Sequence, residues 1–207
     1  MVGLGPGDTD LLTAGTIAAI EHHERCFLRT GRHPAARALG GAESFDEVYE
    51  SAATMSAVYE GIVERLMVEA ERHGTVLYAV PGSPLVAEHT VELLLAQDRV
   101  AVEVLPALSF LDLAWVRLGI DPVEHGVRIV DGHRFAVEAA GERGPLLVAQ
   151  CDTATVLSDI KLALDSGPMP CLDDDAQVVV LQRLGLPDER VLTVAWTELD
   201  RIEADHL

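Results

Sequence analysis

The first residues that could do chemistry form a glycine-rich loop near the start of the chain. The stretch GLGPGD at residues 3–8 contains three glycines in five residues. A dinucleotide fingerprint needs the spacing GxGxxG, and a P-loop needs GxxxxGK[ST]; neither is present here. Asp8 stands where the third glycine of the fingerprint would be, and its carboxylate would repel a pyrophosphate. We therefore expect a tight turn with close backbone approach, in which Asp8 caps a helix beginning near Asp10.

Two further loops rich in Gly, Pro or Ser follow predicted strands, at residues 80–88 (VPGSPLVAE) and 105–110 (LPALSF). Ligands of α/β sheets bind at the carboxyl ends of the strands, so we expect the three loops to line one site. The loops hold few obvious acids or bases. This profile suits a reaction that depends on positioning, and methyl transfer from an activated sulfonium is one such reaction. On these residues alone, Gly5→Val should block the approach and leave the fold largely intact.

Other side chains argue against several chemistries. His22 and His23 lack a third ligand nearby and there is no HExxH pattern, so no metal site is expected. Ser83 lies in GSP and not in the GxSxG turn of a serine hydrolase. The three cysteines lie far apart and form no CxxC pair, so neither a disulfide framework nor a zinc site is expected.

Composition narrows the class of protein. The 207 residues are 49% hydrophobic and 24% charged, which is typical of a packed globular chain. A formal net charge of −19 would repel phosphate backbones, so a nucleic-acid partner is not expected. No apolar run reaches the roughly 18 residues of a membrane span, and acidic residues stand where a signal peptide would be basic. We therefore expect a cytoplasmic location.

The elements that must position these loops alternate between strand-like and helix-like runs, which predicts α/β layers. The apolar run at 75–82 is typical of a parallel strand buried on both faces. Residues 45–74 read as two helical pieces, the second ending at Gly74. A helix is expected over 83–98 and a further strand over 100–107. Two adjacent strand-like runs late in the chain suggest a mixed sheet there. We place a domain boundary near Pro106 and expect two α/β domains, 1–106 with a mainly parallel sheet and 107–207 with a mixed sheet.

The order of these motifs resembles the tetrapyrrole methylase family, also called the corrin/porphyrin methyltransferases. The resemblance is carried by VGLGPGDTDLLT, VPGSPLVAEHT, LPALSF, GPLLVAQC and VVVLQRLGLPDERVLTV. The stretches LRTGRHPAA, SFDEVYE and ELDRIEADHL are similar to the methylase-like domain at the front of MazG-type proteins. In such proteins a nucleotide pyrophosphohydrolase domain follows. We therefore expect that domain after this chain, and the start of strand one before it.

The resemblance implies two α/β domains with a cleft between them, S-adenosylmethionine bound in that cleft, and a homodimer. It implies a methyltransferase that acts on an unidentified small molecule, possible substrates including a tetrapyrrole-like macrocycle. Carried over by position, the cofactor contacts are Pro6, Gly82, Ser83, Val86, Ser109, Phe110, Gln150, Leu184 and Ala195.

Two alternatives stay open at the level of sequence. The chain departs from the family pattern at Ser83, Phe110 and Leu184, which leaves room for a non-catalytic module that binds a ligand, dimerises or regulates a pyrophosphohydrolase domain. The apolar residues of the helix within 54–70 favour a homodimer, but they could equally face the chain's own core. Those residues are Met55, Val58, Ile62 and Met67.

Overall fold

The computed structural model describes residues 1–166, 172–173 and 175–203, so Cys171 lies outside the described residues. The backbone forms two compact units, Met1–Leu113 and Ala114–Leu207. The division falls within helix α5 (Phe110–Leu118), and a domain boundary after residue 106 stays a prediction. Each unit combines strands with helices, so the predicted α/β fold is confirmed.

The first unit is built on a parallel sheet with the strand order β1-β4-β2-β3. Its strands are β1 (Val2–Gly3), β2 (Cys26–Leu28), β3 (Glu43–Ser44) and β4 (Leu77–Val80). All four residues of β4 are buried, as expected for a strand covered on both faces. Because every pairing is parallel, the carboxyl ends of all four strands lie at one edge of the sheet.

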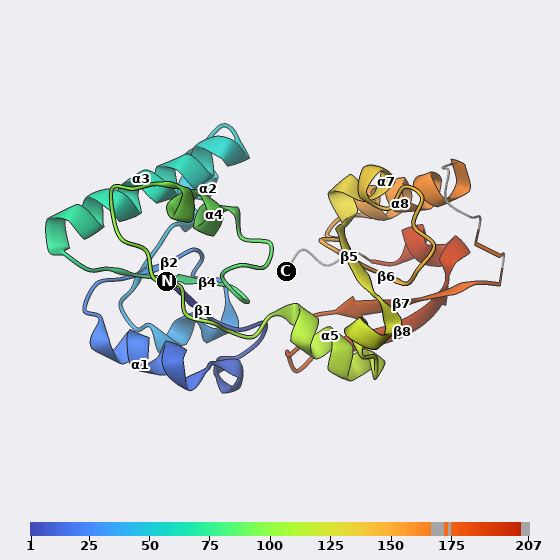
Figure 1. The fold of residues 1–207 in the computed structure, drawn as a ribbon, viewed down its shortest axis with the longest axis horizontal. Coiled ribbons are helices and arrows are strands. Elements are labelled where there is room, and N and C mark those ends of the chain that lie inside the picture. Colours follow the sequence, from blue (N-terminus) through green and yellow to red (C-terminus); the bar gives the residue numbers. More distant parts are fainter. Residues whose placement is uncertain (167–171, 174, 204–207) are drawn as a thin grey trace. The chain divides into compact units, whose positions relative to one another are not determined.

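Helices cover both faces of this sheet (Figure 1). Those of the first unit are α1 (Ala14–His22), α2 (Asp46–Ser51), α3 (Met55–His73) and α4 (His89–Ala96), with 3-10 turns η1 (Thr9–Leu11) and η2 (Pro34–Ala38). Figure 1 shows α2, α3 and α4 on one face and α1 on the other. The two predicted helical pieces over 45–74 are α2 and α3, and α3 ends at Gly74, whose φ is +85°.

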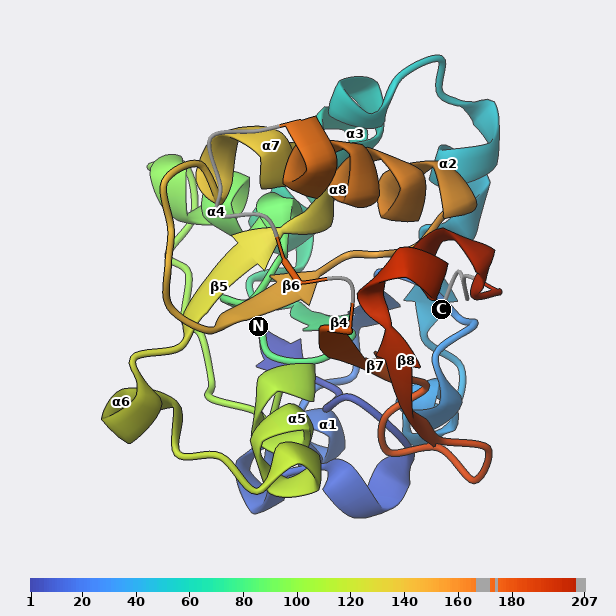
Figure 2. The same cartoon turned by 90° about the vertical axis from the view of Figure 1, so that its right-hand side faces the viewer.

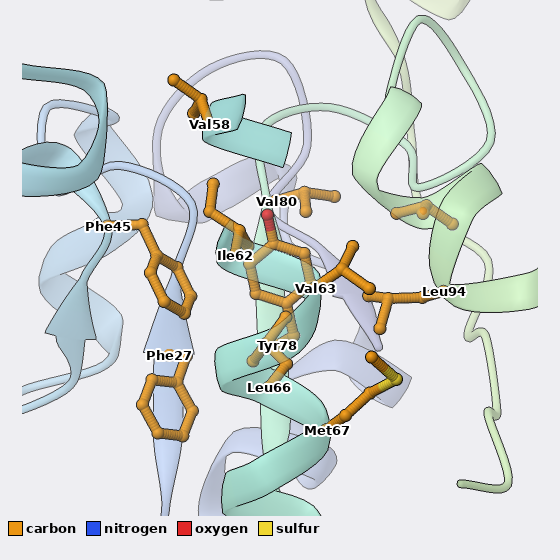
Figure 3. Close-up of a cluster of buried hydrophobic side chains, with 11 residues drawn as sticks. Phe27, Phe45, Val58, Ile62, Val63, Leu66, Met67, Tyr78, Val80 and Leu94 are labelled. Atoms are coloured by element: carbon orange, nitrogen blue, oxygen red, sulfur yellow. The ribbon is translucent and has the colours of Figure 1, made fainter. Parts of the chain in front are cut away.

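The larger core lies between the sheet and α3, as Figure 3 shows. The rings of Phe27 and Phe45 stack with centroids 5.7 Å apart, and Tyr78 meets Phe45 edge-on at 6.0 Å. The apolar stripe of α3 completes this core; Val58, Ile62 and Met67 are buried in it, whereas Met55 is 50% exposed. Three of the four apolar residues that favoured a dimer interface are therefore used inside the unit.

Two predicted elements of the first unit differ in the structure. The predicted helix over 83–98 begins only at His89, because residues 83–86 form a turn in which Val86 donates to the Ser83 carbonyl at 3.1 Å. Residues 101–109 form no strand. Leu105 donates to the Met1 carbonyl at 2.9 Å and the Met1 amino group donates to the Glu103 carbonyl at 2.5 Å, but these bonds do not continue into a ladder with β1.

The second unit contains two separate two-stranded sheets among its described residues (Figure 2). β5 (Arg128–Asp131) and β6 (Leu146–Ala149) are parallel, whereas β7 (Gln177–Gln182) and β8 (Arg190–Ala195) form an antiparallel hairpin. The single mixed sheet expected here is thus replaced by two sheets. The helical elements are α6 (Pro122–His125), η3 (Gly132–Arg134), α7 (Phe135–Glu138), α8 (Ala154–Ser166) and η4 (Trp196–Arg201).

Candidate functional site

The loops after β1 and β4 are joined through their backbones. Gly82 donates its N–H to the Gly5 carbonyl at 2.8 Å, and Gly5 donates to the Gly82 carbonyl at 3.2 Å. This reciprocal pair is an isolated bridge beyond the ends of the two strands. The bridge therefore fixes the loops after β1 and β4 against each other at the carboxyl edge of the sheet, where Gly5 is buried and Gly82 is half-buried.

Gly3 brings the third predicted loop to the same place. A Cβ at Gly3 would lie 2.1 Å from the Gly82 carbonyl oxygen, 2.6 Å from Cβ of Ala107 and 2.9 Å from Cδ of Pro84. Real Cβ atoms do not approach backbone so closely, so only glycine fits here. The three loops singled out from the sequence thus meet at one point of the first unit.

Gly5 is required for a different reason. Its φ is +71°, a left-handed conformation that side chains rarely adopt, and a Cβ there would lie 2.8 Å from the Leu11 carbonyl oxygen. A valine at this position would therefore strain the backbone as well as fill space. The expectation that Gly5→Val leaves the fold largely intact is corrected by this geometry.

Asp8 caps the short turn η1 and not helix α1, which the sequence analysis expected it to cap. Its carboxylate accepts from the Thr9 N–H at the start of η1, whereas α1 is capped by Thr13, whose hydroxyl accepts from the Thr16 N–H at 3.1 Å. Asp8 also pairs with Arg37 at 2.6 Å. The Thr9 N–H and then Arg37 lower the pKa of Asp8. Because its charge is partly balanced, Asp8 alone is no argument against an anionic ligand.

Six of the predicted cofactor residues belong to the first unit. Pro6, Gly82, Ser83 and Val86 are half-buried in the two bridged loops. Ser109 is buried and its hydroxyl accepts from the Leu111 N–H at 3.2 Å, while its own N–H donates to Asp112 at 2.7 Å. Ser109 thus fixes the start of α5, at which Phe110 is half-buried.

The other three predicted cofactor residues belong to the second unit. Gln150 follows β6 and is exposed, Leu184 lies in the β7–β8 turn, and Ala195 ends β8. Leu184 and Ala195 are half-buried. The contacts proposed for these residues remain predictions.

Backbone strain is concentrated next to the predicted cofactor residues. Among the residues that the structure describes, positive φ at non-glycine positions occurs at Ala87 (+55°), Gln150 (+58°) and Arg183 (+54°). Gln150 is itself a predicted contact, and the other two adjoin Val86 and Leu184. Strained residues of this kind persist where the surroundings hold them, and they are frequent in ligand-binding loops.

The loop after β2 lies at the same carboxyl edge of the sheet, and the sequence analysis did not predict it as part of the site. Residues 29–37 hold three arginines and one histidine and no acid, in a chain with 34 acidic residues. His33 accepts from the Ala35 N–H at its Nδ1, at 3.2 Å, and forms a hydrogen bond with the Gly5 backbone. Since Nδ1 accepts, the donor to the Gly5 carbonyl is Nε2–H. A basic run directly after a strand was the signal that could have revealed it.

The described part of the chain contains neither a cluster of metal-binding side chains nor a membrane-spanning helix. Within residues 1–166, 172–173 and 175–203, no three His, Cys, Asp or Glu side chains are grouped so that they could hold a metal ion. In the same part of the chain no helix combines the length and apolar character needed to cross a membrane.

The fold is that of an α/β protein, and in such folds ligands bind at the carboxyl ends of parallel strands, where the loops after β1 and β4 lie. A family model described as Tetrapyrrole (Corrin/Porphyrin) Methylases matches residues 1–200. The chain therefore belongs to the tetrapyrrole methylase family.

Two curated relatives cover most of the chain. The uncharacterized protein YabN of Bacillus subtilis (strain 168) is 37% identical over 208 residues, covering 97% of this chain and 41% of YabN. The chloroplastic S-adenosyl-L-methionine-dependent uroporphyrinogen III methyltransferase of Arabidopsis thaliana is 27% identical, covering 93% of this chain and 55% of that protein. The chain thus spans about half the length of these relatives.

Solved structures show the same fold. Uroporphyrin-III C-methyltransferase from Thermus thermophilus, in complex with S-adenosylhomocysteine, has a TM-score of 0.71 at 21% identity and covers 98% of this chain and 91% of that one. A precorrin-6Y methylase from Archaeoglobus fulgidus has a TM-score of 0.65 at 21% identity, covering 99% of this chain and 92% of that one.

Proposed function

We propose that this chain is a methyltransferase domain that uses S-adenosylmethionine on a small, tetrapyrrole-like molecule. The observation that carries the proposal is the meeting of the three loops at Gly3, Gly5 and Gly82, with the half-buried Gly82 open on its Cβ side at the carboxyl edge of the first sheet. The uroporphyrin-III methyltransferase that shares the fold was solved with S-adenosylhomocysteine, and the Arabidopsis relative is named for this cofactor.

The residues present fit such a cofactor. A Cβ at Gly82 would meet nothing within 4 Å, so the space beside Gly82 is open, and Ser83 and Val86 add a hydroxyl and an apolar side chain to the same loop. Pro6 and Gly82 would hold the cofactor through the first unit, and Gln150, Leu184 and Ala195 through the second. When bound, the cofactor supplies a methyl group already activated by its sulfonium. The chain's part is then to orient the two reactants and exclude water.

Calorimetric titration tests the proposal. We expect the domain to bind S-adenosylmethionine and S-adenosylhomocysteine, and ATP more weakly. Ser83→Trp should weaken binding at least tenfold by filling the loop, whereas Val123→Trp should not, because Val123 is 87% exposed on α6 and is not one of the proposed contacts. Transfer of a labelled methyl group to uroporphyrinogen III would then test the acceptor class. Equal affinities for the two tryptophan variants would contradict the proposed loop contact.

A non-catalytic role is the second candidate. It is favoured by the bulky, half-buried side chains at Phe110 and Leu184, since added volume in a binding site excludes a ligand. In that case the domain would bind another ligand, dimerise or regulate a pyrophosphohydrolase domain. If calorimetric titration with S-adenosylmethionine detects no binding, this candidate is favoured over the methyltransferase.

The assembly and the longer protein are also proposals. We expect a homodimer that buries on the order of 2,000 Å² or more, as obligate dimers do. The dimer proposal now rests on the family resemblance. The apolar residues of α3 no longer support it, since most of them pack in the core of the first unit. We also expect a MazG-type pyrophosphohydrolase domain in the full-length protein, in the cytoplasm. A monomeric mass in light scattering at micromolar concentration would contradict the dimer.

A further inference from the structure

A buried ion pair joins the loop after β2 to the loop after β4. The guanidinium of Arg29, the residue that follows β2, contacts the carboxylate of Glu88, the residue that precedes α4. Their side chains are only 18% and 4% exposed. Removing two charges from water is costly, so a pair of this kind is weak support for stability alone. Its place in the fold suggests another role.

The Glu88 carboxylate is tied to α4 as well as to Arg29. It accepts from the Thr90 N–H at 3.3 Å and from the Thr90 hydroxyl, and so caps the helix. The Thr90 hydroxyl in turn lies 3.2 Å from the hydroxyl of Tyr78 in β4. Burial, followed by the Glu88 charge, raises the pKa of Tyr78, so this phenol stays neutral. Glu88 is therefore fixed in both position and orientation.

Arg29 is held equally firmly. Its guanidinium lies 5.7 Å from the ring centroids of both Tyr49, on α2, and Tyr59, on α3. A planar guanidinium between aromatic rings and a carboxylate has little freedom, and lysine cannot reproduce that arrangement. The pair thus anchors the end of the loop to the helices on one face of the sheet.

Ala87, immediately before Glu88, has the strained φ of +55°. The loop that it ends begins at Gly82, which is bridged to Gly5 by two hydrogen bonds. Residues 82–87 are therefore fixed at one end by the Gly5 backbone and at the other by the Arg29–Glu88 pair. A strained residue between two fixed ends keeps its conformation only while both ends hold.

We propose that the Arg29–Glu88 pair is a positioning device that holds residues 82–87 in the conformation that receives the cofactor. The pair does not itself contact the cofactor; it acts through Ala87 on Ser83 and Val86. This inference rests on the proposed function, because the cofactor contacts of the loop are part of it. Loss of the pair lets Ala87 relax, so the binding-competent loop is populated for a smaller fraction of the time and the apparent affinity falls by that fraction.

Ala87→Gly tests the proposal as a rescue of the Arg29→Lys variant. Glycine adopts positive φ without strain, so residues 82–87 should keep their conformation without the anchor. We expect Ala87→Gly to restore most of the affinity for S-adenosylmethionine that Arg29→Lys loses. A purely structural role for the pair predicts no recovery of affinity, and that result would overturn the proposal.

Arg29→Lys tests the anchor, with Arg32→Lys as its matched control. Arg32 lies in the same loop but is 74% exposed and pairs with Glu50 at the surface, at 3.3 Å. We expect Arg29→Lys to weaken cofactor binding about tenfold relative to Arg32→Lys. Hydrogen exchange of amides 83–88 should also be faster in Arg29→Lys than in Arg32→Lys.

The exchange measurement separates this inference from the proposed function. If the wild type does not bind S-adenosylmethionine, the proposed function fails, and the exchange rates still show whether Arg29 holds the loop. Equal exchange in the two lysine variants would overturn the positioning role whatever the cofactor. Faster exchange confined to residues 83–88 would support it.

Discussion

The Gly5 carbonyl accepts from the Gly82 N–H at 2.8 Å, and Gly82 accepts from Gly5 at 3.2 Å. This reciprocal pair connects the loops after β1 and β4, which are neighbours in the sheet but distant in the chain. The same Gly5 backbone is reached by His33 from the loop after β2. Three loops therefore depend on one glycine junction for their positions.

Gly3→Ala should destabilise the first unit more than most alanine substitutions. Its Cβ would clash with the Gly82 carbonyl oxygen at 2.1 Å, a backbone atom that can move only with its loop. Overpacking costs about 1–3 kcal/mol or more, and we expect the upper end of that range from urea unfolding. Gly40→Ala is the control, because a Cβ there meets nothing within 4 Å. Equal unfolding midpoints would show that the loops are not packed as described.

Thr13→Ala should cost more stability than Asp8→Ala. Thr13 caps α1 through the Thr16 N–H, whereas Asp8 caps only the three-residue turn η1. Loss of a helix N-cap costs about 1 kcal/mol, which thermal or urea unfolding of the Thr13 variant would detect. If Asp8→Ala lost more stability than Thr13→Ala, Asp8 would be the more important cap, as the sequence first suggested.

Acidification should weaken the junction through His33. Burial lowers the pKa of His33 below its usual 6.5, while the Gly5 carbonyl and the Asp8 carboxylate oppose this shift. The unfolded chain then binds the proton more readily, so this contribution to stability is complete above about pH 6.5 and is lost as the pH falls through the lowered pKa. Protonation also turns Nδ1 into a donor that faces the Ala35 N–H.

The His33 effect is measured as the difference in unfolding free energy between the wild type and His33→Gln across pH 5–8. We expect the difference to be largest at neutral pH and to shrink on acidification. A pH-independent difference would show that His33 does not titrate in this window.

Ile62→Ala should destabilise the unit by about 2–5 kcal/mol, because Ile62 is fully buried in the core against the sheet. Met55→Ala, at an exposed position of the same helix, should change stability by less than about 0.5 kcal/mol. Urea unfolding at two protein concentrations tests both variants. If the Ile62 effect depended strongly on concentration, α3 would contribute to a subunit interface as well as to its own core.

Local sequence was enough to determine many elements of this protein. The apolar run of β4, the two helices over 45–74, the stop at Gly74 and the two adjacent strands late in the chain were all predictable, because each depends on neighbouring residues. The three glycine- and proline-rich loops were found for the same reason. The parallel pairing of β1 and β4 places the first two at one edge of the sheet, and the third reaches them through Ala107 beside Gly3.

Only the tertiary structure decided which residues meet across that edge. The Arg29–Glu88 pair, the contact of His33 with Gly5 and the pairing of Leu105 with Met1 join residues far apart in the chain. No periodicity or capping rule encodes such contacts, because they depend on how loops of different strands pack. The pairing of Asp8 with Arg37 of η2, at 2.6 Å, is a further contact of this kind.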